Sequence, residues 1–159
     1  MPYSKCKVFI PNVGGDISIS VTTKEVEKTN LFVSTPQYTP TSTGTSVDEV
    51  AIGGRLATGG VVKYWASGHL VTRFIEAIPG DSFKIRTDSA EQNTYDWFAN
   101  GYNIDKTHIT QEGKNRWQFD EDGKGGIFTV PNISAWSGTK FIKLCLPYVD
   151  INNITIYKV

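Results

Sequence analysis

The sequence predicts an all-β protein, an antiparallel β-sandwich of jelly-roll or galactose-binding-like type. Apolar and polar residues alternate in short runs, as on strands with one buried face. These runs are rich in Val, Ile, Thr and aromatic residues, which suit a pleated sheet. Turn residues separate the runs at intervals that give about ten strands in 159 residues. Helical periodicity is almost absent, so we expect under about a tenth of the residues in helix.

The predicted strands follow one another from the N-terminus. The first alternating run lies at 17–22. A longer run at 70–78 is followed by Pro-Gly-Asp at 79–81, which is typical of a tight turn. We therefore expect the runs at 70–78 and 82–86 to pair as a hairpin. The later predicted strands are 95–98, 116–120, 126–130, 140–147 and 154–157.

Residues 35–46 differ from the rest of the chain. They are rich in Thr, Ser and Pro and show no apolar alternation, which predicts an extended surface loop. This loop separates residues 1–34, with a predicted strand pair over 5–34, from a main sandwich over 47–159. A strand pair is too small to fold alone. It either completes the sandwich or forms an arm that packs on another subunit.

Charge and segment composition exclude several classes of partner. Sixteen basic and sixteen acidic residues cancel, which argues against a nucleic acid or an anionic membrane as partner. No segment has the length and apolarity of a membrane span, and the first residues lack the apolar core of a secretory signal. We therefore expect synthesis in the cytoplasm without secretion. Cys6 and Cys145 are expected to stay reduced, with a bridge between them as the alternative.

The sequence carries none of the common enzyme signatures. It has no nucleophile elbow, phosphate-binding loop, zinc-protease motif or Cys-x-x-Cys pair, so we predict no catalytic residues, no cofactor and no metal. His69 and His108 are expected to be structural or surface residues. The acidic stretch at 120–123 has part of the character of a calcium loop but lacks the ligand spacing of one. We expect a solvated turn there, with calcium binding as the alternative.

The four tryptophans provide the candidate binding residues. Trp97 and Trp117 lie in alternating runs and are predicted to be core. Trp136 lies in a polar connection, where an exposed ring suggests a surface on which a sugar can stack. A second polar turn, near residue 102, adds further candidates, although packing in the core is the alternative for its tyrosine. The predicted saccharide site consists of Trp136, Asn132, Ser137, Asn100, Tyr102 and Asp105.

The order of strands and turns from residue 68 to residue 159 carries a resemblance to a known family. The relevant segments are 72–85, 99–109, 128–132, 140–147 and 152–157. Together they resemble the accessory β-domains of bacteriophage tail-fibre, baseplate and head-fibre proteins. The resemblance implies a jelly-roll or galactose-binding-like sandwich in a virion protein, and it assigns no binding residues.

These observations lead to one leading hypothesis and two alternatives. The leading hypothesis is a non-enzymatic phage virion structural protein, of fibre or baseplate type, that binds host-surface saccharide. Its expected partners are the host glycan, other virion proteins and further copies of itself in a homotrimer, because repeated weak sites gain avidity. The first alternative is a decoration protein of capsid or tail without a glycan site. The second is a carbohydrate-active enzyme or its carbohydrate-binding module.

Overall fold

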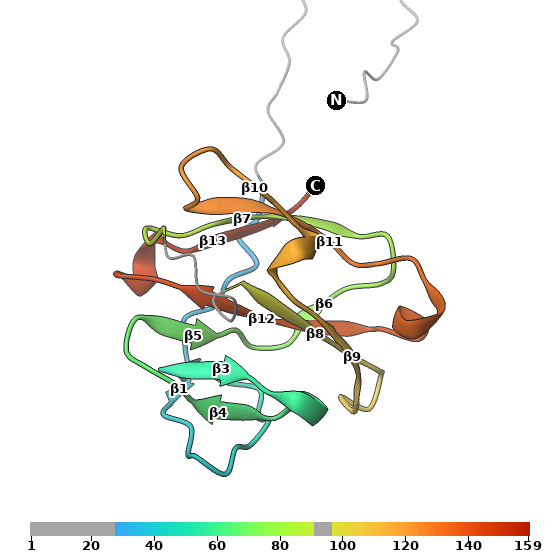
Figure 1. Ribbon diagram of the computed structural model, residues 1–159, viewed down its shortest axis with the longest axis horizontal. Helices are drawn as coiled ribbons and strands as arrows, with labels where there is room; N and C mark the ends of the chain where they lie inside the picture. Colours follow the sequence, from blue (N-terminus) through green and yellow to red (C-terminus); the bar gives the residue numbers. More distant parts are fainter. Residues whose placement is uncertain (1–27, 91–96) are drawn as a thin grey trace, which may run out of the picture.

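The computed structural model describes residues 28–90 and 97–159, and in these ranges the protein is an all-β sandwich. A seven-stranded and a four-stranded sheet pack face to face, and a short two-stranded sheet lies on the outer side of the larger one (Figure 1). The predicted antiparallel β-sandwich is confirmed. Helix in the described ranges is confined to four three-residue 3₁₀ turns: η1 (Thr58–Gly60), η2 (Lys114–Arg116), η3 (Ser134–Trp136) and η4 (Ile151–Asn153).

The seven-stranded sheet has the order β1-β2-β5-β12-β8-β9, and β6 also pairs with β12. Its longest strand, β12, pairs antiparallel with β5, β6 and β8, while β1 and β2 pair in parallel. The strands are β1 (Gln37–Tyr38), β2 (Val50–Ile52), β5 (His69–Val71), β6 (Ile75–Glu76), β8 (Phe98–Tyr102), β9 (His108–Glu112) and β12 (Phe141–Pro147).

The four-stranded sheet is antiparallel throughout, in the order β10-β11-β7-β13. Its strands are β7 (Ser82–Arg86), β10 (Trp117–Phe119), β11 (Gly125–Thr129) and β13 (Thr155–Lys158). The third sheet pairs β3 (Gly54–Leu56) with β4 (Val62–Tyr64). Strand β3 contacts β5, β8 and β12, so this hairpin covers the larger sheet on the side away from the sandwich interior.

The alternation along β12 divides its side chains between two cores, because successive side chains on a strand point to opposite faces. Ile142, Leu144 and Leu146 belong to the main core between the large sheets, whereas Cys145 belongs to the smaller core under β3 and β4. The predicted core positions of Trp97 and Trp117 are confirmed, because both belong to the main core. The four-stranded sheet contributes Phe83, Ile85, Phe128 and Ile156 to the same core.

The turn at 79–81 is confirmed, but the hairpin predicted around it is wrong. Gly80 has a φ of 93°, and the amide of Asp81 donates to the carbonyl of Ile78 at 3.0 Å. The strands on either side belong to different sheets, since β6 pairs with β12 and β7 pairs with β11 and β13. Val130 exchanges backbone hydrogen bonds with the turn, to Gly80 and Asp81. The turn therefore carries the chain between the two layers of the sandwich.

The segment before the first strand lies beside β13. The amide of Leu31 donates to the carbonyl of Ile156 at 2.8 Å, and the Oδ1 of Asn30 accepts from the amide of Ile156 at 2.8 Å. Most of the strand pair predicted over 5–34, including the run at 17–22 and Cys6, lies outside the described residues. Cys145 is buried, with its Sγ 3.7 Å from the carbonyl of Gly54.

Candidate functional site

The sequence predicts an exposed ring at Trp136, and this prediction is wrong. Trp136 has no exposed surface, and it ends the 3₁₀ turn η3, where its amide donates to the carbonyl of Ile133 at 2.9 Å. This turn folds the loop back over Gly101, which has no side chain to obstruct the indole. A Cβ at Gly101 would lie only 2.9 Å from Cζ3 of Trp136. The polar residues of the loop lie on its outer surface, and Trp136 anchors the loop to the core.

The structure does not gather the six predicted site residues into one place. Asn132 and Ser137 are exposed beside the buried Trp136, and Asp105 is exposed in the turn between β8 and β9. Asn100 and Tyr102 are buried on the side of β8 opposite to the face that Gly101 presents to Trp136.

Tyr102 is a structural residue. Its hydroxyl donates to the carbonyl of Gly60 at 2.9 Å, and burial raises the pKa of Tyr102 to about 12. That hydrogen bond ties β8 to the η1 turn, so the core alternative considered for Tyr102 is the correct one. Asn100 is also fully buried, on β8 between Lys143 of β12 and Gln111 of β9. Asn100 and Tyr102 therefore do not share an exposed surface with Asn132 and Ser137.

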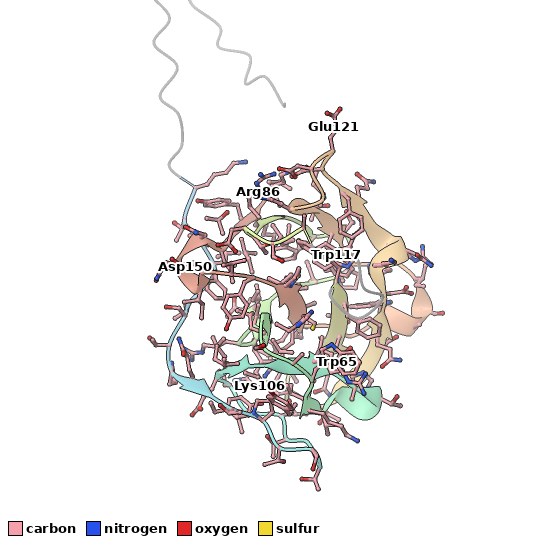
Figure 2. All side chains as sticks on the ribbon, turned by 60° about the vertical axis from the view of Figure 1, so that its left-hand side comes forward. Trp65, Arg86, Lys106, Trp117, Glu121 and Asp150 are labelled. Atoms are coloured by element: carbon pink, nitrogen blue, oxygen red, sulfur yellow. The ribbon has the colours of Figure 1, made fainter. Side chains whose placement is uncertain are left out.

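A different surface has the features of a ligand site, at the end of the β10–β11 hairpin. A pocket of about 490 Å³ opens there, within the range typical of small-molecule sites. Trp117 lies in its wall, and Glu121 lies at the tip of the hairpin turn (Figure 2). The lining residues are Trp97, Lys114, Asn115, Trp117, Phe119, Asp120, Glu121, Asp122 and Gly123.

Three aromatic rings form one wall of this pocket. The ring of Trp97 meets those of Trp117 and Phe119 edge-on, at centroid distances of 5.1 and 5.3 Å. Trp117 and Phe119 lie nearly parallel, 6.3 Å apart. The two indoles are buried, whereas Phe119 is 41% exposed, so Phe119 presents an accessible ring on a rigid aromatic base. The Nε1 of Trp117 is buried and, within the described ranges, has no hydrogen-bond acceptor.

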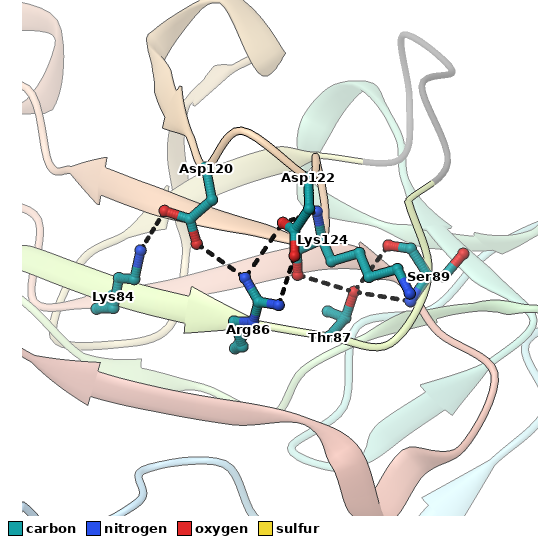
Figure 3. A network of polar contacts seen from close by, with 7 residues as sticks. All are labelled: Lys84, Arg86, Thr87, Ser89, Asp120, Asp122 and Lys124. Atoms are coloured by element: carbon teal, nitrogen blue, oxygen red, sulfur yellow. Dashed lines mark hydrogen bonds and ion pairs between the residues drawn. The ribbon is translucent and has the colours of Figure 1, made fainter.

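An ion-pair network holds the acidic turn against the four-stranded sheet (Figure 3). Arg86 binds Asp120 Oδ2 through Nη1 at 3.2 Å and Asp122 Oδ2 through Nη2 at 2.6 Å, and Lys84 binds Asp120 Oδ1. The hydrogen bond from Lys84 lowers the pKa of Asp120, and that from Arg86 lowers the pKa of Asp122. The predicted turn is present, with two of its carboxylates held by cations of β7. Its position beside the aromatic wall is therefore fixed.

The acidic turn is not arranged as a metal site in the residues described. No group of three or more His, Cys, Asp or Glu side chains in 28–90 and 97–159 is placed to hold a metal ion. The carboxylates of Asp120 and Asp122 already accept from Lys84 and Arg86, whose charges compete with any cation. Glu121 is exposed at the pocket rim and adds a further acceptor. The site thus combines an aromatic surface with hydrogen-bonding groups around it.

The sequence contains a pattern that indicates this pocket, but the pattern spans a strand and a turn and is not visible in the composition of one loop. Trp117 and Phe119 share one face of β10, and the acidic turn follows them directly in the sequence. Lys84 and Arg86, which fix the turn, lie more than thirty residues away in the chain. The sequence predicts Trp117 in the core and the acidic turn at 120–123 in solvent. Neither prediction indicates that the two form one site.

Comparisons with known proteins do not assign the chain to a family. No protein-family model, curated protein or solved structure matches it. Across the described ranges, no helix is long and apolar enough to span a membrane.

Proposed function

We propose that the protein is a non-enzymatic phage virion structural protein, of fibre or baseplate type, that binds host-surface saccharide in the pocket beside Phe119. The observation that carries the proposal is the exposed ring of Phe119, supported by two indoles and bordered by a fixed acidic turn. The apolar face of a pyranose packs on such a ring, as other flat apolar groups do. Its hydroxyls donate to the carboxylates of the acidic turn.

The ionisation of the carboxylates in the pocket favours binding of a saccharide over its hydrolysis. A glycoside hydrolase needs a carboxylic acid whose pKa is raised, so that it holds a proton for the leaving group. Asp120 and Asp122 have lowered pKa values, because Lys84 and Arg86 stabilise their charged forms. Both carboxylates are thus suited to accept hydrogen bonds from hydroxyls and unsuited to donate a proton.

We further propose a homotrimer within the virion. A single small pocket gives a weak site, and display of several copies on one particle raises the effective affinity. Closed cyclic symmetry suits attachment at the tip of a fibre. Light scattering at tens of micromolar, on the full chain, tests this part separately, and a monomer contradicts it.

Phe119→Ala is expected to weaken saccharide binding by about 5- to 150-fold, the equivalent of roughly 1–3 kcal/mol for one stacking ring. The half-exposed ring contributes less to the core than its neighbours, so the melting temperature should fall by only a few degrees. Tryptophan fluorescence is the readout, because Trp97 and Trp117 line the pocket. The titration uses a panel of neutral mono- and disaccharides and purified host-surface polysaccharide.

The matched control is Tyr64→Ala, which removes another half-exposed aromatic ring, on β4 in the outer hairpin. Its affinity should equal that of the wild type. Equal affinity of Phe119→Ala and the wild type would show that the saccharide site is not this pocket. Release of reducing sugar from the polysaccharide during the titration would contradict the non-enzymatic part of the proposal.

A further inference from the structure

A second charged cluster lies at the seven-stranded sheet, around the carboxylate of Asp48. Its Oδ1 accepts from Arg73 Nε at 3.5 Å and from the amide of Phe74 at 3.2 Å. Its Oδ2 accepts from Lys106 Nζ at 2.9 Å. Lys143 on β12 adds another cation close to the same carboxylate. The cluster therefore combines the cations Arg73, Lys106 and Lys143 with the carboxylate of Asp48, so positive charge is in excess.

Lys143 is the most unusual member of the cluster, because a lysine is rarely fully buried. Its Nζ donates to the carbonyl of Val47 and lies 4.5 Å from the centroid of the Phe74 ring. Lys106 Nζ lies 4.9 Å from the same centroid. Phe74 is thus in contact with two ammonium groups, and the potential around it is positive.

A pocket of about 250 Å³ opens beside this cluster. The segment before β1 supplies an apolar wall, and Asp48 and Arg73 supply the charged wall. Asp48 is a carboxylate that accepts from Arg73, Phe74 and Lys106, so it has no donor to offer to a carboxylate ligand. The lining residues are Leu31, Phe32, Val33, Asp48, Thr72, Arg73, Phe74 and Ile75.

Arg73 has donors to spare at this pocket. A guanidinium carries five N–H groups in a planar fork. Nε donates to Asp48, and Nη1 donates to the carbonyl of Thr35 at 3.3 Å. Within the ranges that the structure describes, Nη2 donates to no residue. A carboxylate is the group whose geometry matches these remaining donors.

We propose that this pocket is a second binding site, which takes a small organic carboxylate. Its apolar part packs on Phe32, Val33 and Phe74, and its carboxylate pairs with the free donors of Arg73. The excess positive charge from Lys106 and Lys143 favours an anion over a neutral ligand of the same shape. The site is separate from the saccharide pocket beside Phe119 and does not depend on it.

The test compares benzoate with benzamide, which has the same shape and no charge. Amide and guanidinium NMR signals of the full chain are followed at constant ionic strength. Benzoate is expected to shift the Arg73 Nε–H and Phe74 N–H signals to saturation at millimolar concentration, and benzamide to leave them unchanged. Arg73→Gln should abolish the saturation, and Lys106→Gln should weaken binding several-fold. Lys158→Gln, which removes an exposed lysine paired with Asp81, should bind as the wild type does.

Equal shifts with benzoate and benzamide overturn the proposal, as does an unchanged benzoate affinity in Arg73→Gln. A third titration, with glucuronate, identifies the source of the carboxylate. Saturating shifts at Arg73 with glucuronate support an acidic saccharide as the ligand. Shifts with benzoate alone support a free carboxylic acid. Failure of Phe119→Ala to change saccharide binding bears only on the first pocket, so the two proposals fail independently.

Discussion

Replacement of Trp136 by Ala is expected to lower the free energy of unfolding by about 3–5 kcal/mol, the range for removal of a large aromatic residue from a core. Trp136 is fully buried, and its ring packs on Gly101 and, at a centroid distance of 6.1 Å, on Phe128. The cavity left behind lies between the polar loop and the main sheet. Neighbouring strands are tied by backbone hydrogen bonds and are unable to collapse into it.

Urea unfolding measures the loss, and Ile133→Ala is the matched control. Ile133 lies in the same loop with half of its surface exposed, so its truncation should change stability by no more than about 0.5 kcal/mol. Equal stability of Trp136→Ala and Ile133→Ala contradicts the assignment of Trp136 to the core. Within 28–90 and 97–159 the indole Nε1 has no hydrogen-bond partner, so Trp136→Phe loses no hydrogen bond there and should be less harmful than Trp136→Ala.

A second substitution tests the contact itself. Gly101→Ala places a methyl group 2.9 Å from the indole and 3.0 Å from the Oγ1 of Thr139, which should cost about 1–3 kcal/mol. In the double variant with Trp136→Ala, the methyl group occupies part of the cavity. The combined destabilisation should therefore be smaller than the sum of the two single effects. Additive effects would show that the two residues do not contact each other in solution.

The fold class was predictable from the sequence because alternation is a local property. Each run of alternating residues identifies a strand and its buried face, as at Phe83 and Ile85 of β7. The partner of a strand is not a local property. The turn at 79–81 has the composition of a hairpin turn, yet it connects the two sheets, because β7 finds its partners β11 and β13 far along the chain. Turn residues specify backbone geometry and do not specify pairing.

The candidate site was harder to predict than the fold, for a related reason. The polarity of its sequence neighbours predicts an exposed Trp136, but burial depends on what packs on the ring from elsewhere. Gly101 makes room for Trp136, and Lys84 and Arg86 position the acidic turn beside Trp117. Such contacts join residues that are distant in the chain. A single sequence shows the types of residue that can make such contacts, but it does not show which residues contact each other.

Lys143 makes stability depend on pH in the alkaline range. The pKa of Lys143 is lowered from 10.5 to about 8, chiefly by burial; Asp48 opposes this shift, and the charges of Lys106 and Arg73 add to it. Between pH 8 and 10.5 the unfolded chain therefore binds more protons at this position than the folded protein does. The contribution of Lys143 to the free energy of unfolding therefore rises with pH across this window and is constant below it. Above pH 10 the raised pKa of Tyr102 acts in the opposite direction, because the unfolded phenol ionises first.

The free energy of unfolding should therefore rise by about 2 kcal/mol between pH 8 and pH 10, and Lys143→Met should remove this rise. The methionine has a similar length and no charge, so the variant should be at least as stable as the wild type at pH 7, where the buried ammonium is charged. Asp48 keeps its contacts with Arg73 and Lys106 in this variant. Urea unfolding at half-unit pH steps gives the profile, and Lys158→Gln, at an exposed site, should keep the wild-type rise. A flat wild-type profile, or a rise that persists in Lys143→Met, would show that Lys143 is not the group responsible.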